Sequence, residues 1–595
     1  MISSLDGRVH KQASAYTTER VTGNMQVLNW NLYKSKWKHL ERIKFPQVGS
    51  RPIVDLLIGV DQADLLYSLE DVRGRPGEPI ARLTPLRWTC IGNPELQASQ
   101  AQTNFTFLVN ESHELNNLVR RFWDVDDSKE IKLVKPEEKI ARDLVAETLT
   151  FEDGHYSVGL PWKTKDHDLP DNFTMAMHRL QSTEKRLQKS PELAKAYSDV
   201  LETYQDKGYI RKVLQEEEKS DQVWYLPHFP ILRPDKSTTK VRVVFDASAK
   251  CEEVSVNDFL LQGPKLKNDL FTVLLRFRRD PVALMCDIKE MSLQIKLNPS
   301  DRPYHRFLWR NMKTKENPSV FEFEQVVFGV NSSPFLAQFV TQKHARKYQS
   351  QFPLEAETVL KSTYMDDSMD SVPDKETGIE LYKQLSQLWA SAGMQARKWL
   401  SNVSEVLERI PHADCVTEVD LDRGELPVVK TLCVLWTPNE DEFKYQVHPP
   451  SRDHYSTKRA FLKGIATLFD PLGFLSPYVI RTKIILQEMW ESGVDRDDLV
   501  EESLLRKAQE WFEELSQLPR LCVPRCLRIG LGVKKITLHT FTDASQQACG
   551  AATYSRHLYK DGSVTCPLVD SKSRVTPLQA VSIPRLELMA AVVGL

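Results

Sequence analysis

"STYMDDSMDS", residues 362–371, crowds three aspartates into a short stretch. The residues on either side, TVLKSTYM and SMDSV, indicate two strands joined by a tight turn, so Asp366 and Asp367 are expected at the tip of a hairpin. Neighbouring carboxylates repel each other. The pair is interpreted either as a solvated turn or as a metal-binding site, whereas Asp370 is expected to be a solvated charge on the second strand.

An upstream stretch favours the second interpretation. PVALMCD, residues 281–287, is an unbroken apolar run that ends in Asp287, which is typical of a buried central strand that carries a carboxylate to the edge of a sheet. Two-metal phosphoryl or nucleotidyl transfer uses carboxylates from adjacent elements to hold two Mg²⁺ ions, which prefer carboxylate oxygens and substrate phosphates. An isolated Asp-Asp pair favours a solvated turn, but Asp287 together with Asp366 and Asp367 favours a metal site.

The composition is that of a globular protein with several domains. A chain of 595 residues is too long for one hydrophobic core. The net charge of −2 excludes a basic field over the whole molecule, although residues 233–281 carry ten Lys and Arg against seven Asp and Glu, which allows a local basic groove. The nine cysteines lack zinc-binding spacing, and no signal peptide or membrane-length apolar run is present, so an intracellular protein with reduced thiols is expected.

Local patterns predict the elements that surround the aspartates. Ser190 and Pro191 are expected to start a helix that runs to about residue 210, and Ser333 and Pro334 to start another. Strands are expected where the pattern alternates or is apolar, at residues 223–234, 239–248 and 321–329. Residues 536–555 are expected to form two further strands, the first of which ends at Asp543.

YMDD (364–367) resembles the metal-binding motif of reverse transcriptases, and further blocks narrow the resemblance to the Pol polyprotein of BEL/Pao-type retrotransposons. The blocks follow the family's order: YLPHFPILRPDKSTTKVRVVFDASAK (225–250), SVNDFLLQGP (255–264), HRFLWR (305–310), VVFGVNSSPF (326–335), ARKWLSN (396–402), KTLCVLW (430–436), LFDPLGFLSP (468–477) and SIPRLELMAA (582–591). The resemblance implies an α+β multidomain fold, with a right-hand polymerase (fingers/palm/thumb), a β-rich peptidase remnant before it and the first part of an RNase H-like α/β fold after it.

The resemblance also implies an order of domains. The expected segments are a C-terminal remnant of an aspartic peptidase-like domain (1–94), a linker (95–149), reverse transcriptase fingers and palm (150–400), thumb and connection (401–535) and the N-terminal part of an RNase H-like domain (536–595).

Four residues receive catalytic roles from the resemblance. Asp287, Asp366 and Asp367 match the family's three catalytic aspartates, and metal binding is expected of Asp287 and Asp366. Lys398 matches the lysine that protonates the leaving pyrophosphate. The alternative for Lys398 is an ordinary lysine after a helix.

Other matched residues are expected to contact substrates. Those assigned to the incoming nucleotide are Lys236, Lys240, Arg242, Ser292, Tyr364 and Met365. Those assigned to template or primer are Phe328, Gly329, Ser333, Pro334 and Trp436. The alternatives are solvated surface charges for the basic residues and an ordinary strand-to-helix turn for residues 328–334. Trp436 lies in a segment that resembles the hairpin that grips the primer, although Cys433 replaces the family's usual glycine there.

Ser292 departs from the family pattern. Reverse transcriptases typically place Phe or Tyr five residues after the first catalytic aspartate, as a steric gate against the ribose 2′-hydroxyl. Ser292 occupies that position here. A serine leaves space where a ring is expected, so the sequence predicts weaker discrimination against ribonucleotides or a damaged active site.

The two ends also depart from the family pattern. Residues 52–61, with Leu57, Ile58 and Gly59, resemble the strand behind the active site of a Pao-type peptidase, but the sequence has no Asp-Ser/Thr-Gly triplet, so no peptidase activity is expected. Asp543 and Glu587 match two metal-binding carboxylates of RNase H. The other carboxylates are expected beyond Leu595, so the domain is expected to be incomplete and inactive, and the sequence a fragment.

The sequence therefore predicts an RNA-directed DNA polymerase of a retrotransposon. Its expected cofactor is Mg²⁺, two ions, with Mn²⁺ as a substitute. The expected partners are an RNA template, a DNA primer, an RNA–DNA hybrid, dNTPs and other parts of a Gag-Pol polyprotein, with no membrane. The expected location is the cytoplasm or intracellular virus-like particles, and the nucleus after reverse transcription. The alternative is an inactive or co-opted remnant that binds nucleic acid without polymerising.

Overall fold

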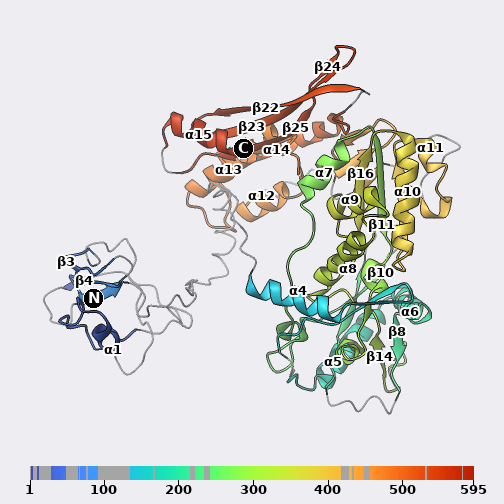
Figure 1. Cartoon of the computed structure of the whole chain (residues 1–595), viewed down its shortest axis with the longest axis horizontal. Helices are drawn as coiled ribbons and strands as arrows, with labels where there is room; N and C mark the ends of the chain where they lie inside the picture. Colours follow the sequence, from blue (N-terminus) through green and yellow to red (C-terminus); the bar gives the residue numbers. More distant parts are fainter. Residues whose placement is uncertain are drawn as a thin grey trace. The chain divides into compact units, whose positions relative to one another are not determined.

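The computed structural model describes two compact units, Met1–Asp124 and Val125–Leu595. Figure 1 colours their elements by position in the sequence. The described residues are 2–3, 10–11, 28–47, 65, 67–75, 78–91, 135–164, 168–214, 222–232, 241–416, 428–431, 434–447, 456–528, 532–578 and 581–595. Helices and mostly antiparallel sheets are mixed along the chain, which fits the predicted α+β class.

The first unit has a small core of its own. Strands β3 (Glu70–Val72), β4 (Ile80–Thr84) and β5 (Arg87–Ile91) form an antiparallel sheet, and β1 (Ile2–Ser3) pairs with β2 (His10–Lys11). The short helix α1 (Trp30–Tyr33) contributes Trp30 to the core, and Trp37, directly after the short helix η1 (Lys34–Lys36), is also buried there. The strand expected at residues 52–61, with Leu57, Ile58 and Gly59, lies outside the described residues.

A four-stranded antiparallel sheet forms the centre of the second unit. Its strand order is β15 (Thr363–Tyr364), β16 (Asp367–Val372), β11 (Val282–Ile288) and β17 (Ala396–Ser401). Every residue of β11 except Asp287 is buried, which confirms the prediction of a buried strand that ends in a carboxylate. The turn between β15 and β16 consists of Met365 and Asp366, so the predicted hairpin tip is also confirmed.

Two predicted strands are shorter than expected. Residues 358–361 of the expected strand TVLKSTYM belong instead to helix α9 (Pro353–Lys361), because Pro353 suits the first turn and Ala356 and Val359 bury one helical face. Strand β14 (Ser319–Phe323) ends before the expected residue 329. The chain then turns toward Gly329, whose φ of 114° lies in a region that favours glycine.

Helices α7 (Leu270–Arg278), α9 and α10 (Lys375–Ala390) pack against β16. Helix α8 (Ser333–Lys347) starts where predicted, with Ser332 as its N-cap.

The region before the central sheet contains three helices and several small sheets. Ser190 caps α6 as predicted, accepting a hydrogen bond from Leu193 N at 3.4 Å. The two strands predicted within residues 223–234 and 239–248 are confirmed as the shorter β9 (His228–Leu232) and β10 (Val241–Phe245), which pair antiparallel. The other elements of this region are α4 (Pro136–Thr148), α5 (Phe173–Leu187), α6 (Pro191–Asp206), β6 (Thr150–Glu152), β7 (His155–Val158) and β8 (Ile210–Lys212). Strands β12 (Lys296–Leu297) and β13 (Arg306–Trp309) follow β11 in the sequence and pair with β7 and β14.

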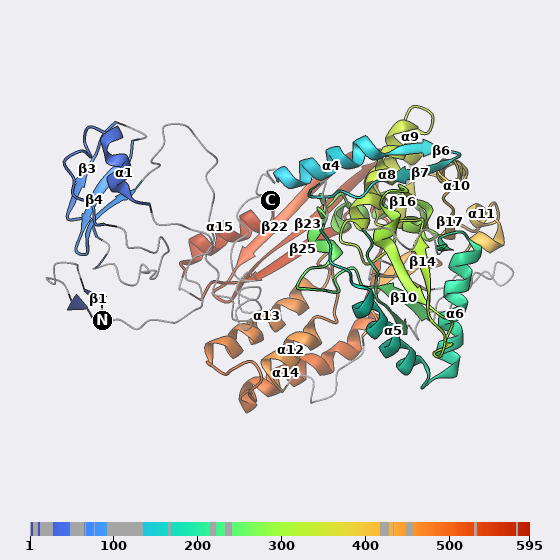
Figure 2. The same ribbon diagram turned by 90° about the horizontal axis from the view of Figure 1, so that it is seen from below.

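The region after the central sheet consists of a second antiparallel sheet and three helices. The sheet contains β18 (Val429–Thr431), β19 (Val434–Thr437), β20 (Glu442–Lys444) and β21 (Cys522–Pro524). The helices α12 (Lys458–Ile465), α13 (Ser476–Glu491) and α14 (Glu502–Glu514) pack together, with α13 against both of the others (Figure 2). No helix in the described part of the chain combines the length and the apolar character needed to cross a membrane.

The last elements form a small α/β unit. Strands β22 (Val533–Ala544) and β23 (Ala548–Tyr559) pair along their length, as predicted for residues 536–555. Strands β24 (Val564–Thr565) and β25 (Leu568–Val575) also pair with β23, and helix α15 (Ile583–Val593) packs against β22 and β23.

Two buried arginines join these regions. Arg278, at the end of α7, donates to the carbonyls of Val569 at 2.5 Å and Leu568 at 2.7 Å in β25. Arg525 is fully buried, forms a bidentate pair with Asp441 at 2.5 and 2.8 Å, and also donates to carbonyls at the end of α7 and the start of β11. The two guanidinium groups therefore tie the central sheet to both later sheets.

We predict that Arg525→Met lowers the free energy of unfolding by about 3–5 kcal/mol, because it leaves the Asp441 carboxylate and several buried carbonyls without their donor. The matched control is Arg459→Met, which breaks an exposed bidentate Arg–Asp pair with Asp497 and should cost much less, because solvent screens exposed pairs. Urea denaturation of the two variants checks this difference. Equal losses in both would show that the Arg525 cluster does not stabilise the fold.

Candidate active site

The three predicted catalytic aspartates meet at one end of the central sheet. Asp287 in β11 lies directly opposite Asp367 in β16 in the strand register. The backbone N–H of Ile288 donates to the carbonyl of Asp366 at 2.9 Å, which holds the turn beside the end of β11. Strand pairing thus brings together carboxylates that are far apart in the sequence.

The surroundings of Asp366 disfavour its ionised form. Burial, and then the negative charge of Asp287, raise the pKa of the Asp366 carboxyl. The cations of Lys398 and Arg242 act in the opposite direction but do not cancel the increase. The turn therefore holds a carboxyl group whose ionised form is destabilised unless a further cation is supplied.

Lys398 already contacts this group of carboxylates. Its Nζ lies 2.6 Å from Oδ2 of Asp287, and Nε of Arg397 lies 3.8 Å from the same oxygen. Lys398 has a φ of 53°, in the left-handed region, and strand β17 changes register against β11 at this level. This irregularity places two successive basic residues beside one carboxylate.

The donor chemistry of the site fits a divalent cation. Carboxylate oxygens are the ligands that Mg²⁺ prefers, and a cation would relieve the repulsion between Asp287 and Asp366. Among the described residues, however, no three His, Cys, Asp or Glu side chains converge as a metal site, and Asp287 is paired with Lys398. Asp287 and Asp366 are the residues that would hold the metal.

Residues outside the predicted set hold the turn that carries Asp366. Gln338 in α8 donates to the carbonyl of Met365 at 2.9 Å, and Met365 has a φ of 59°. Nζ of Lys267 lies 3.2 Å from the hydroxyl of Tyr364 and 5.4 Å from its ring centre. Sequence reasoning missed Gln338, Lys267 and Arg397. Of these, only Arg397 had a local signal, its position next to Lys398.

Arg242, whose charge acts on Asp366, also contacts the segment that contains Phe328 and Gly329. The Arg242 guanidinium lies 4.8 Å from the ring centre of Phe328, which is 40% exposed. At Gly329, a Cβ would lie 1.9 Å from the carbonyl oxygen of Phe245, so no other residue fits without backbone movement. The predicted nucleotide-binding residues Lys236 and Lys240 lie outside the described residues.

Two of the predicted template and primer contacts have structural roles. Ser333 is buried and donates to the carbonyl of Val327 at 2.7 Å, whereas its neighbour Pro334 is exposed. Trp436 is fully buried and donates to Asp441 at 3.0 Å. The expectation that Trp436 contacts the primer is therefore corrected: its ring packs edge-on against Phe277 in the core.

Two family models match the chain. One describes a reverse transcriptase (RNA-dependent DNA polymerase) and matches residues 241–399, which include the three aspartates and Lys398. The other describes a Pao retrotransposon-like RNaseH-like domain and matches residues 457–595. The chain is a Pol segment of the Pao retrotransposon type. No curated protein matches the chain.

Within the reverse transcriptase domain, Ser292 lies in η4 (Met291–Gln294), the short helix directly after β11. The side chain is buried. The preceding Glu290 has a φ of 51° and is held by Lys207 at 2.8 Å and Tyr209 at 2.9 Å. Ser292 is therefore part of a tightly packed turn next to the catalytic strand.

The Pao RNase H-like domain contains the other two predicted metal ligands. Asp543 is exposed near the end of β22, opposite Gly550 of β23, and Glu587 lies in α15. The end of α15 lies over β22, because a Cβ at Gly594 would be 2.8 Å from the Thr540 side chain. The pairing of a β22 carboxylate with an α15 carboxylate stays a prediction.

We predict that Asp366→Asn raises the melting temperature of the metal-free protein by about 1–3 °C. A carboxyl whose pKa is raised by folding destabilises the native state as the pH rises through that pKa, so neutralising it stabilises the fold at pH 7. The same variant should lose the stabilisation that Mg²⁺ gives the parent.

Asp374→Asn is the matched control for thermal unfolding. Asp374 caps α10, hydrogen bonds from Thr377 lower the pKa of its carboxyl, and asparagine can replace it as a cap. Its neutralisation should not raise the melting temperature. A melting temperature of Asp366→Asn at or below that of the parent would contradict the proposed repulsion.

Proposed function

We propose that the chain is an RNA-directed DNA polymerase that extends a primer 3′-end on an RNA or DNA template by two-metal nucleotidyl transfer. The observation that carries this proposal is the register of β11 and β16, which sets Asp287 opposite Asp367 beside the Asp366 turn. In a right-hand polymerase, this sheet would be the palm, residues 150–400 would include the fingers, and residues 401–535 would supply the thumb and connection.

The roles of the chain's own residues follow from their positions. Asp287 and Asp366 would bind Mg²⁺, which when bound helps to ionise the attacking 3′-hydroxyl and neutralises the leaving pyrophosphate. Lys398, paired with Asp287 before the metal binds, would give its proton to the leaving pyrophosphate. Arg242 is close enough to Asp366 to influence its ionisation, and it would bind the triphosphate as a fixed positive charge.

The nucleic acid would be bound mainly through its backbone. Phe328 and the close backbone approach at Gly329 would pack against the template and the new base pair. Because such binding is electrostatic, the affinity for nucleic acid should fall steeply as the salt concentration rises. We propose no peptidase activity, because the sequence contains no Asp-Ser/Thr-Gly triplet.

We predict that the parent extends oligo(dT) on poly(rA) in the presence of Mg²⁺ and dTTP. Asp366→Asn should lower the extension rate by at least about a thousandfold, since it removes a metal ligand on which the reaction depends. The control is Asp374→Asn, which should retain parental activity because Asp374 only caps α10.

Two outcomes of this assay separate the polymerase from the alternative. Hybrid binding by the parent without any extension favours a remnant that binds nucleic acid but does not polymerise. Extension that persists at the parental rate in Asp366→Asn would show that the reaction does not occur at this carboxylate cluster.

We predict that Ser292→Phe raises the selectivity for dTTP over UTP by about 10–100-fold, since a ring at this position would clash with the ribose 2′-hydroxyl. Steady-state incorporation of each nucleotide measures the ratio. Ser292→Ala is the control that adds no ring and should keep the parental ratio. Equal selectivity in the parent and Ser292→Phe would contradict the role of this position as a sugar gate.

A further inference from the structure

Asp370 contradicts the expectation that it is a solvated charge. Its side chain is 2% exposed in the middle of β16. Side chains alternate along a strand, so Asp370 faces the side of the sheet opposite to Asp367. Burial of a carboxylate is costly unless hydrogen bonds and opposite charges compensate, so the surroundings of Asp370 require an explanation.

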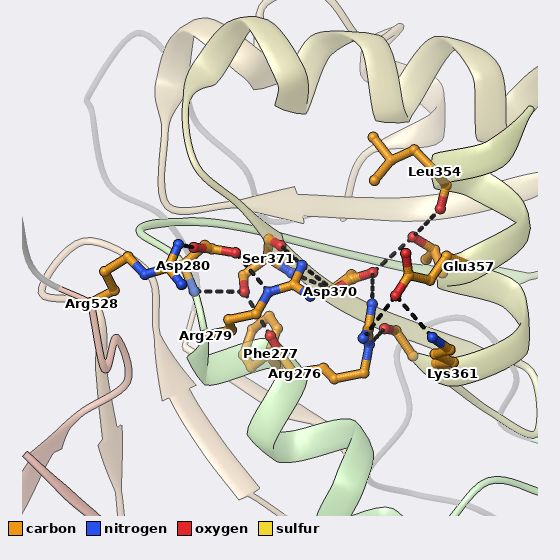
Figure 3. Close-up of polar contacts among 12 residues, drawn as sticks. Arg276, Phe277, Arg279, Asp280, Leu354, Glu357, Lys361, Asp370, Ser371 and Arg528 are labelled. Atoms are coloured by element: carbon orange, nitrogen blue, oxygen red, sulfur yellow. Dashed lines mark hydrogen bonds and ion pairs between the residues drawn. The ribbon is translucent and has the colours of Figure 1, made fainter. Parts of the chain in front are cut away.

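The carboxylate of Asp370 has partners from three elements. The Thr358 hydroxyl of α9 donates to Oδ2 at 2.8 Å, and the backbone N–H of Ser371 donates to Oδ1 at 2.9 Å. Two guanidinium groups from the end of α7 face it, with Arg276 at 3.7 Å and Arg279 at 3.8 Å. Figure 3 shows the side chains of Arg276 and Arg279 reaching toward Asp370.

Arg276 also contacts the other strand of the hairpin. Its Nε donates to the hydroxyl of Ser362 at 2.6 Å, and Ser362 directly precedes β15. The same guanidinium faces Asp370 in β16, so it contacts both strands at the base of the hairpin. The backbone N–H of Met369 donates to the carbonyl of Ser362 at 2.9 Å and joins the two strands at the same level.

Ser371 completes the attachment to α7. Its hydroxyl donates to the carbonyl of Arg276 at 2.6 Å and accepts from the backbone N–H of Asp280 at 2.9 Å. Arg279 donates to the carbonyl of Ser371 at 3.0 Å. We call Arg276, Thr358, Ser362, Asp370 and Ser371 the hairpin clamp.

We propose that the hairpin clamp, with Asp370 at its centre, is a positioning device that fixes the height and angle of the Asp366 turn relative to Asp287. This proposal rests on the proposed polymerase function. None of the five clamp side chains is assigned to the metal or substrate. Their role is to hold the two strands that carry the catalytic carboxylates, which must be placed within a fraction of an ångström for efficient chemistry.

Stability alone does not explain the clamp. Buried ion clusters are commonly neutral or unfavourable compared with apolar side chains of the same volume. A fold that needed only a stable hairpin could use an apolar side chain at residue 370, as it does at the neighbouring Met369 and Val372. Directional hydrogen bonds define a single geometry for the hairpin more strictly than apolar contacts do.

The cluster also supplies a matched control. Glu357 is 41% exposed and pairs with the same Arg276 at 3.2 Å, but it lies on α9 and has no bond to the hairpin in the described structure. Figure 3 shows Glu357 and Lys361 on the outer side of Arg276. Glu357→Gln therefore removes a charge from Arg276 without removing a bond to the hairpin.

The test measures metal binding and catalysis separately on the full chain. Mn²⁺ binding without nucleic acid is followed by electron paramagnetic resonance, and the Mg²⁺ dependence of primer extension gives the half-saturating concentration. We expect Asp370→Asn to raise both the Mn²⁺ dissociation constant and the half-saturating Mg²⁺ at least about tenfold. The KM for dTTP should change less, since the clamp does not touch the nucleotide.

Ser362→Ala removes the hydrogen bond from Arg276 to the residue before β15. It should raise both the Mn²⁺ dissociation constant and the half-saturating Mg²⁺ concentration, by a smaller factor than Asp370→Asn does. It also provides the test if Asp370→Asn does not fold. Glu357→Gln should stay within about twofold of the parent, because it leaves every bond of the clamp to the hairpin in place.

The outcomes distinguish the clamp from the polymerase function. If Asp370→Asn and Ser362→Ala have the same Mn²⁺ dissociation constant and half-saturating Mg²⁺ concentration as Glu357→Gln, the clamp proposal is overturned, even if the parent extends primers. A parent that binds Mn²⁺ but extends no primer would overturn the polymerase function, and a weaker Mn²⁺ affinity in Asp370→Asn would still support the clamp.

Discussion

The antiparallel pairing of β11 with β16 is the constraint on which the active site depends. Its register sets Asp287 opposite Asp367 and holds the Asp366 turn against the end of β11. A slip of one residue would turn Asp367 to the other face of the sheet and bury Asp370 on the face of Asp287. The proposed function of the site therefore depends on this register.

The carboxylates on the two faces of β16 have different surroundings. On the face of Asp367, Asp287 and Asp366 repel each other, and Lys398 and Arg397 approach Asp287 from β17. On the opposite face, Asp370 is enclosed by hydroxyl, amide and guanidinium donors. We propose that the face with the repelling carboxylates binds a metal and substrate phosphates, and that the donors on the opposite face hold the strand in place.

Structural features that depend on a few adjacent residues could be predicted from the sequence. The apolar run of β11, the turn at Asp366 and the Ser190 cap of α6 each depend on a few adjacent residues. Features set by remote partners were not predictable. Asp370 is buried because Arg276 and Thr358 reach it from two helices, Trp436 is core because Phe277 and Asp441 enclose it, and residues 353–361 form a helix because one face is covered.

The central claim is that Asp287 and Asp366 form the metal site of a nucleotidyl transferase. The most direct measurement is anomalous diffraction from crystals of the chain with primer–template, Mn²⁺ and a non-hydrolysable dNTP analogue. The account predicts a Mn²⁺ peak bound by the carboxylates of Asp287 and Asp366, with Lys398 moved away from Asp287. Peaks only at other sites, with the Lys398–Asp287 pair intact, would contradict it.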